Sequence, residues 1–121
     1  MENLYIKETE FTPEIDFNAQ TGNLLLKGRA ISEYMAKFYQ PILDWLHEYK
    51  KVAQKTTIFH AKYEYFSSDS SDKTTLDILS ALEEIEGVMV YWYYLEDDED
   101  MQEAGEEFAE LLEVPFKFIV C

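Results

Sequence analysis

Four serines and two aspartates are concentrated between residues 67 and 72, in the run S-S-D-S-S-D. A strand-like segment ends just before this run, at Phe66, and an apolar helical pattern begins after it, near Leu76. Serine and aspartate side chains accept hydrogen bonds from the free N–H groups of a first helical turn, so the run could simply cap a helix. The same position suits a phosphoserine, because free N–H donors and the helix dipole both stabilise a phosphate. The run therefore has two interpretations, a capped helix start and a phosphorylation site.

A second polar cluster, the run E-D-D-E-D from Glu96 to Asp100, directly follows an apolar segment. Carboxylates at a helix N-terminus offset the positive end of the dipole, and each contributes about 0.3–1 kcal/mol. The run holds more acids than capping requires, so part of it is a candidate surface for a partner or a kinase. A Mg²⁺ site is a third alternative, whereas an EF-hand is excluded because the run lacks the central glycine. The candidate partner-binding residues are Asp97, Asp98, Glu99 and Asp100.

The remaining residues with reactive side chains indicate no catalytic site. His60 lies on the polar face of a predicted strand, and neither it nor His47 has a companion at ligand spacing, so no zinc site is expected. The single cysteine, Cys121, is the last residue, which rules out an internal disulfide. The serines have no histidine at a nucleophile spacing, and no glycine-rich phosphate loop is present. We expect a protein without catalytic residues, metal or cofactor.

Hydrophobic periodicity in the first half predicts short strands followed by a helical segment. The helical segment runs from Ser32, a candidate N-cap, toward Val52, and Pro41 lies inside it. Pro41 predicts either a kink or two helices, the second of which opens at the proline. The three predicted strands are Leu4–Glu10, Ile15–Asn18 and Leu24–Arg29.

The second half alternates between strand and helix patterns. Thr57–Phe66 is predicted to point Phe59, Ala61, Tyr63 and Tyr65 to one face. A helix then continues to a stop at Gly87. Further predicted elements are the strand Val88–Leu95, a helix over Met101–Leu112 with Gly105 in its middle, and the strand Phe116–Val120.

The strand Val88–Leu95 is apolar throughout, as expected of a strand that is covered on both faces. Such a cover would bury Tyr91 and Tyr93, which could otherwise contribute to an interface. Strand, helix, strand, helix, strand from Thr57 onward predicts parallel pairing. The expected fold class is α/β: a single domain over residues 1–121, with an N-terminal strand meander, a parallel βαβαβ part and three helices. If the strands before the serine run and the acidic run are neighbours, the two runs lie at the same carboxyl edge of the sheet, where such folds place their sites.

Composition restricts the class of partner. The 121 residues contain 25 acids against 10 bases, a formal net charge of −15. This balance disfavours nucleic acid and anionic membranes, and it favours basic partner surfaces. No apolar run is long enough to span a membrane, and no secretory signal is visible. We therefore expect a cytoplasmic protein that binds neither nucleic acid nor membrane and is a monomer or a weak dimer.

Several segments, in this order, resemble the SiaC family of bacterial regulatory phosphoproteins. The resemblance extends from about Thr12 to Phe118, and the aromatic and acidic block that begins at Trp92 is its most specific part. The segments are T-P-E-I-D-F (Thr12–Phe17), L-L-L-K-G-R (Leu24–Arg29), F-Y-Q-P-I-L-D-W-L (Phe38–Leu46), Y-F-S-S (Tyr65–Ser68) and W-Y-Y-L-E-D-D-E-D-M-Q-E-A-G-E-E-F (Trp92–Phe108).

The resemblance implies a fold similar to anti-anti-sigma (STAS-like) regulators and a non-enzymatic role in partner switching. A dedicated kinase would phosphorylate one Ser or Thr before the second helix, and a PP2C-like phosphatase would remove the phosphate. The unphosphorylated form would bind and activate a diguanylate cyclase, and so control cyclic-di-GMP and biofilm formation. The alternative function is a metal- or nucleotide-dependent enzyme that uses the Asp97–Asp100 cluster.

The acceptor that the resemblance implies depends on how the serine run is aligned, because this chain has one more residue between Phe66 and Lys73 than the family pattern. Aligned from Phe66, the acceptor is Ser68. Aligned from Lys73, the position falls on Asp69, which leaves Ser70 as the nearest substitute. Ser68 is the prediction, with Ser70 and Ser71 as alternatives, and Asp69 could mimic a partly phosphorylated state.

Overall fold

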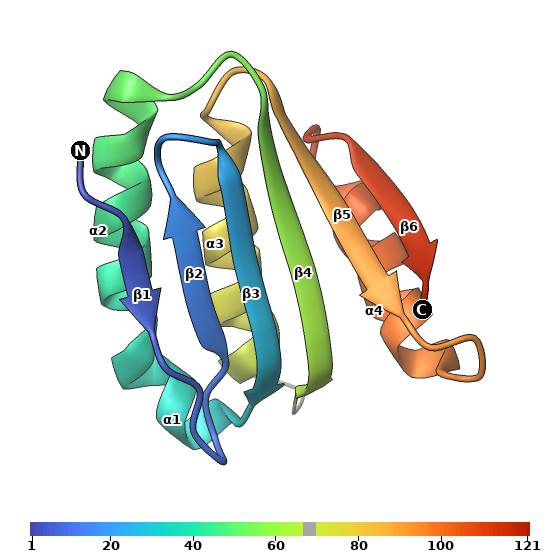
Figure 1. Ribbon diagram of the computed structural model, residues 1–121. Coiled ribbons are helices and arrows are strands. Elements are labelled where there is room, and N and C mark those ends of the chain that lie inside the picture. The colour runs from blue at the N-terminus through green and yellow to red at the C-terminus, as the bar shows by residue number, and fades with distance from the viewer. Residues whose placement is uncertain (67–69) are drawn as a thin grey trace.

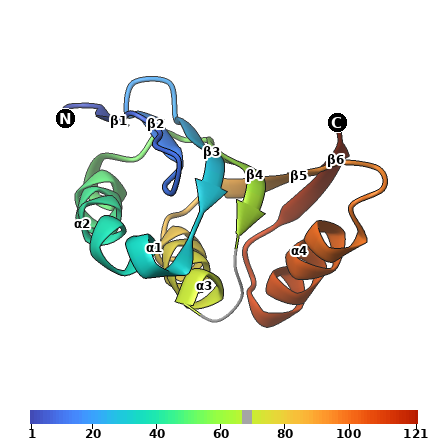
Figure 2. The same cartoon turned by 90° about the horizontal axis from the view of Figure 1, so that it is seen from below.

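The computed structural model describes residues 1–66 and 70–121, and it places the α-helices of this part of the chain on one face of a six-stranded sheet (Figures 1 and 2). The strands are β1 (Leu4–Ile6), β2 (Glu14–Asn18), β3 (Asn23–Ala30), β4 (Thr57–Phe66), β5 (Val88–Tyr94) and β6 (Phe116–Val120). The helices are α1 (Ser32–Phe38), α2 (Gln40–Tyr49), α3 (Ser70–Glu83) and α4 (Glu99–Leu111), and a short 3₁₀ turn, η1 (Lys50–Val52), follows α2.

The strands lie in the sheet in the order of the sequence, from β1 to β6. β1, β2 and β3 form an antiparallel meander, and β3, β4, β5 and β6 pair in parallel. The predicted mixed sheet, with its meander and its parallel βαβαβ part, is confirmed. The parallel part also includes β3, because the helical segment α1–α2 forms the crossover from β3 to β4.

The helical segment predicted over Ser32–Val52 is divided at Tyr39, which is the C-cap of α1 and the N-cap of α2. Pro41 lies in the first turn of α2, where a backbone N–H would have no intrahelical acceptor. Of the two alternatives for Pro41, two helices with the proline opening the second is therefore confirmed. The N-cap residue of α1 is Ile31 rather than Ser32, and its backbone N–H donates to the carbonyl of Phe11 at 2.9 Å.

The core lies between the sheet and the helices. Trp92, Tyr49, Phe17 and Phe59 are its largest fully buried side chains. Buried hydroxyls are paired: the Tyr49 hydroxyl lies 2.7 Å from the Thr57 hydroxyl, and a similar pair at 2.7 Å joins Tyr63 to α3. No buried side-chain polar atom in the described part of the chain lacks a hydrogen-bond partner. None of the described helices is long and apolar enough to span a membrane.

The strand β5 is covered on one face only, so the expectation of a doubly covered strand is wrong. Val88, Val90 and Trp92 are buried toward the helices, whereas Met89 is 37% exposed and Tyr91 and Tyr93 are half-buried on the opposite face. The physical reason is that α3 and α4 lie on the same side of the sheet (Figure 2). The outward residues Met89, Tyr91 and Tyr93 have large side chains that are mostly apolar. The sequence of β5 therefore looks like that of a strand buried on both faces.

The strand β4 follows the predicted alternation as far as Tyr63. Phe59, Ala61 and Tyr63 are buried, but Tyr65, predicted on the same face, is 49% exposed. The register of β3 and β4 shifts between Gly28, which pairs with Tyr63, and Arg29, which pairs with Tyr65. This irregularity turns Tyr65 outward, where its ring centroid lies 5.7 Å from the guanidinium carbon of Arg29.

Candidate functional site

The carboxyl ends of β4 and β5 lie at one edge of the sheet, because these strands are parallel neighbours. β4 ends at Phe66 and α3 begins at Ser70, while β5 ends at Tyr94 and α4 begins at Glu99. Ser68, the predicted acceptor, lies outside the described residues. The alternatives Ser70 and Ser71 are the first two residues of α3. The two strands are thus neighbours, which was the condition set for bringing the runs together, and the identity of the acceptor stays a prediction.

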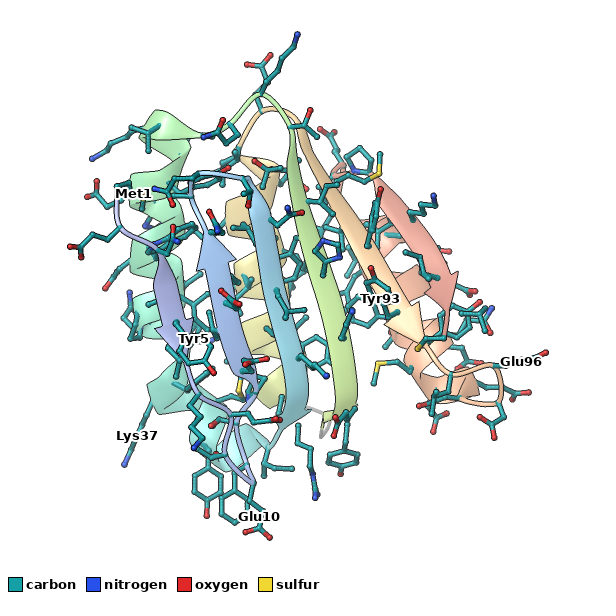
Figure 3. All side chains as sticks on the ribbon, in the orientation of Figure 1. Met1, Tyr5, Glu10, Lys37, Tyr93 and Glu96 are labelled. Carbon is teal, nitrogen blue, oxygen red and sulfur yellow. The ribbon has the colours of Figure 1, made fainter. Side chains whose placement is uncertain are left out.

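The acidic run begins α4. Asp98 is the N-cap residue, and its Oδ1 accepts a hydrogen bond from the backbone N–H of Met101 at 3.1 Å. Glu99 and Asp100 lie in the first turn, where they offset the positive end of the helix dipole. Asp97 is exposed in the turn before the cap, beside the exposed Glu96 (Figure 3). The helix-start interpretation is therefore confirmed for Asp98, and a partner contact by the run stays a prediction.

The strands β4 and β5 separate as they approach this edge. Their pairing runs from Thr57–Val88 to Ala61–Trp92, although β4 continues beside β3 to Phe66 and β5 continues beside β6 to Tyr94. A cavity of about 330 Å³ lies where they separate. Its lining residues are Lys27, Lys62, Tyr63, Glu64, Tyr93, Tyr94, Leu95, Asp98, Met101 and Cys121.

A histidine and two tyrosines meet on the open face of the sheet next to this cavity. The Nδ1 atom of His60 lies 2.9 Å from the hydroxyl of Tyr93, and the imidazole contacts the ring of Tyr91 edge-on at 5.4 Å between centroids. Burial lowers the pKa of His60, and the nearby Lys62 ammonium lowers it further. Burial likewise raises the pKa of Tyr93, with smaller contributions from Tyr91 and Cys121. Both side chains are therefore neutral near pH 7.

Two lysines lie over the same tyrosine rings. The Lys62 ammonium is 4.6 Å from the centroid of the Tyr93 ring, and the Lys117 ammonium is 5.6 Å from that of Tyr91. His60, expected to be a solvated strand residue, is thus half-buried within an aromatic and basic cluster. The sequence signal for this cluster is the period-2 alternation of the two strands. It places His60 and Lys62 on the same face of β4, and Tyr91 and Tyr93 on the same face of β5. Their contact follows only once those two faces are known to be the same.

The described residues contain no group of three or more His, Cys, Asp or Glu side chains placed to hold a metal ion. In this part of the chain the acidic run is divided between a cap, a first helical turn and an exposed turn. The site consists of hydrogen-bonding, charged and aromatic groups around a cavity. Such a set is suited to binding another molecule.

The protein therefore belongs to the class of α/β proteins, with an acidic run and a cavity at the carboxyl ends of neighbouring parallel strands. The chain belongs to the SiaC family of regulatory phosphoproteins, whose family model matches residues 6–121. The family resemblance found in the sequence is thereby confirmed.

Individual relatives match along nearly the whole chain. An uncharacterized protein of Pseudomonas aeruginosa is 30% identical over 120 residues, which covers 96% of this chain and 94% of the relative. The crystal structure of apo-SiaC from Pseudomonas aeruginosa has a TM-score of 0.87 at 29% identity, covering 99% of this chain and 100% of that chain. A further match, with a TM-score of 0.88 at 29% identity, is to a chain in the crystal structure of the diguanylate cyclase SiaD in complex with its activator SiaC from Pseudomonas aeruginosa; it covers 98% of this chain and 99% of that chain.

Proposed function

We propose that this protein is a non-enzymatic cytoplasmic signalling protein that binds and activates a diguanylate cyclase in its unphosphorylated form. The observation that carries the proposal is the similarity, along 98% of the chain, to a chain in a complex of a cyclase with its activator SiaC. Activation of the cyclase would raise cyclic-di-GMP and favour biofilm formation. The exposure of Asp97, Glu99 and Asp100 supports a contact between the acidic run and a partner.

The switch in this proposal is reversible phosphorylation by a cognate Ser/Thr kinase, with a PP2C-like phosphatase removing the phosphate. Ser68 is the proposed acceptor, and Ser70 and Ser71 are the alternatives. Membership in a family of regulatory phosphoproteins supports the switch. The position of Ser70 and Ser71 at the start of α3 supports an acceptor nearby, since a phosphate there meets free N–H groups and the positive end of a helix dipole.

Phosphorylation would act on the partner surface through charge. A phosphoserine carries about −1.5 to −2 charges at pH 7. The proposed partner-binding residues Asp97, Asp98, Glu99 and Asp100 follow the neighbouring strand at the same edge of the sheet. A phosphate added at this edge would increase its negative charge, and like-charge repulsion would then weaken binding of the cyclase.

The test compares four forms of the protein: unphosphorylated wild type, phosphorylated wild type, Ser68→Ala and Ser68→Glu. Calorimetry measures their affinity for the purified cognate cyclase, and product formation measures activation. We expect Ser68→Ala to bind like unphosphorylated wild type and to accept no phosphate from the kinase. Ser68→Glu should bind more weakly, but less so than the phosphorylated protein, because one carboxylate has less charge and fewer acceptor oxygens than a phosphate.

Equal affinity of all four forms would exclude the switch, and absence of binding by the unphosphorylated wild type would exclude the cyclase as the partner. Ser70→Ala and Ser71→Ala are the matched controls. Should phosphate incorporation persist in Ser68→Ala and disappear in one of these two variants, the switch stands and the acceptor is reassigned.

A further inference from the structure

The open face of the sheet carries a positive patch in a protein whose net charge is −15. We call it the lysine–tyrosine patch and define it by Lys27, Lys62, Lys117, His60, Tyr91 and Tyr93. The patch contains three ammonium groups, and none of them belongs to the ion pairs of the described residues. Two carboxylates lie at its border: Glu14 is opposite Lys27 across β2 and β3, and Glu64 lines the cavity beside the patch. It extends over the outward side of β3 to β6, opposite the helices, where Figure 3 shows Tyr93.

Contacts within the patch hold two of its three lysines over aromatic rings. Lys62 lies over Tyr93 and Lys117 over Tyr91, and the hydroxyl of Tyr93 is hydrogen-bonded to His60. Lys27 pairs with Lys62 across β3 and β4, and Lys117 pairs with Tyr91 across β5 and β6. Because β3 and β6 are three strand spacings apart in the sheet, Lys27 and Lys117 are separated by at least about 14 Å. This span fits an extended stretch of polypeptide better than a small anion.

The cavity between the separated ends of β4 and β5 adjoins the patch, since Lys27, Lys62 and Tyr93 line both. Tyr94, Leu95 and Met101 add apolar surface to its walls. Its volume of about 330 Å³ exceeds that of a single large side chain and is at the lower end of the roughly 300–1,000 Å³ of small-molecule pockets. Interfaces place their anchor residues in such well-formed recesses and surround them with polar contacts.

We propose that the lysine–tyrosine patch and this cavity form the surface that binds an acidic segment of the output partner. A large apolar side chain of that segment enters the cavity, and its carboxylates lie over Lys27, Lys62 and Lys117. Glu64 of β4 and Asp98 at the start of α4 also line the cavity. The partner's carboxylates therefore lie over the three lysines, and the apolar side chain alone enters the cavity beside Glu64 and Asp98. The inference rests on the proposed function and adds a second contact surface to the proposed partner-binding residues Asp97–Asp100.

The experiment measures binding of the unphosphorylated protein to the purified cognate cyclase at several salt concentrations. The variant is Lys62→Glu with Lys117→Glu, and its control is Lys37→Glu with Lys55→Glu, which changes the net charge equally. Lys37 and Lys55 are exposed and lie outside the patch, Lys37 at the end of α1 (Figure 3) and Lys55 before the start of β4. We expect the patch variant to bind about tenfold or more weakly and to lose most of its salt dependence, as removal of interface charges does. The control should stay within about twofold of wild type.

A third variant, Leu95→Trp, tests the cavity without a change in charge. Leu95 is 57% exposed at the cavity, so the larger side chain should narrow the cavity while the fold and the salt dependence stay unchanged, and binding should weaken. Equal binding by wild type, the patch variant and Leu95→Trp would overturn this inference and leave the proposed function intact. Equal weakening by the patch variant and the control would also overturn it, because net charge alone would explain the effect. Absence of binding by wild type would overturn the proposed function together with this inference.

Discussion

At the scale of single residues, Gly105 packs closely against the indole of Trp92. A Cβ atom added at Gly105 would lie 2.5 Å from Cδ1 and 2.6 Å from Nε1 of Trp92. The indole cannot move easily, because it is fully buried and its Nε1 donates a hydrogen bond to the carbonyl of Met101 at 2.9 Å. The glycine thus lets the backbone of α4 approach the five-membered ring of the indole.

We therefore predict that Gly105→Ala destabilises the protein. The added methyl should cost about 1–3 kcal/mol through overpacking, which outweighs the gain of about 1 kcal/mol in helix propensity. Urea unfolding measures the difference in the free energy of unfolding. The control Glu103→Ala, at an exposed position of the same helix, should change stability by less than about 0.5 kcal/mol. A higher free energy of unfolding for Gly105→Ala would show that the ring has room to shift.

The pair His60 and Tyr93 leads to a second prediction, on pH. Burial and Lys62 lower the pKa of folded His60 below its ordinary value of 6.5, so the unfolded chain binds a proton more readily than the folded one. The contribution of neutral His60 to the free energy of unfolding is therefore complete above about pH 6.5. It decreases as the pH falls from that value to the lower pKa of the folded state.

Melting temperatures at about pH 7.5 and about pH 5.5 test this effect, with His60→Gln as the comparison. The melting temperature should decrease more between the two pH values for wild type than for His60→Gln, because the variant has no group at this position to protonate. Equal losses in the two proteins would mean that protonation of His60 is not coupled to folding.

At the scale of elements, the residues of the acidic run have different roles at the start of α4. Asp98 accepts the hydrogen bond from the Met101 N–H, whereas Asp97 is exposed in the preceding turn. Asp98→Ala should lower the free energy of unfolding by about 1 kcal/mol, since it removes an N-cap. Asp97→Ala should leave stability within about 0.5 kcal/mol of wild type, and it is the matched control for charge. Similar losses for both variants in chemical denaturation would assign the effect to the summed charge of the run and not to the cap.

Most elements were predictable because their signals are local. Pro41 predicted either a kink or a second helix, and the structure has the second helix. The alternation of β4 predicted the burial of Phe59, Ala61 and Tyr63. Tyr65 was placed on the wrong face, because the register shift that turns it outward depends on the partner strand β3. The one-sided cover of β5 was missed for a similar reason, since a strand's own residues do not specify on which face its crossover helices pack.

The candidate site was predictable in outline and not in its contacts. The order of strands and helices placed the serine run and the acidic run at carboxyl ends of strands, and the sheet confirms that these strands are neighbours. The cavity and the lysine–tyrosine patch were not predictable, because they arise from the separation of β4 and β5 after Ala61 and from side chains that meet across four strands. Such contacts depend on tertiary register, which composition and periodicity leave open.

At the scale of the whole molecule, acidic residues greatly outnumber basic ones. The net charge is −15, and among the described residues only two ion pairs form, Lys50–Glu84 at 3.9 Å and Lys51–Glu48 at 3.2 Å, both between exposed side chains. Exposed pairs of this kind contribute little. The helix α4 has acids in its first turn and no basic residue in its last turn, so the carboxylates near its C-terminus oppose the helix dipole. Self-repulsion therefore acts against the folded state.

We predict that sodium chloride stabilises this protein. Raising its concentration from about 0.02 M to about 0.5 M shortens the range of charge repulsion to a few ångströms, so the melting temperature should rise by several degrees. Glu110→Lys should raise the melting temperature at low salt, because it removes a carboxylate from the last turn of α4 and places a cation four residues after Glu106. The gain from Glu110→Lys should shrink at high salt, where the repulsion is already screened. A melting temperature that falls with salt, or a gain from Glu110→Lys that salt leaves unchanged, would show that net repulsion does not limit the stability of this fold.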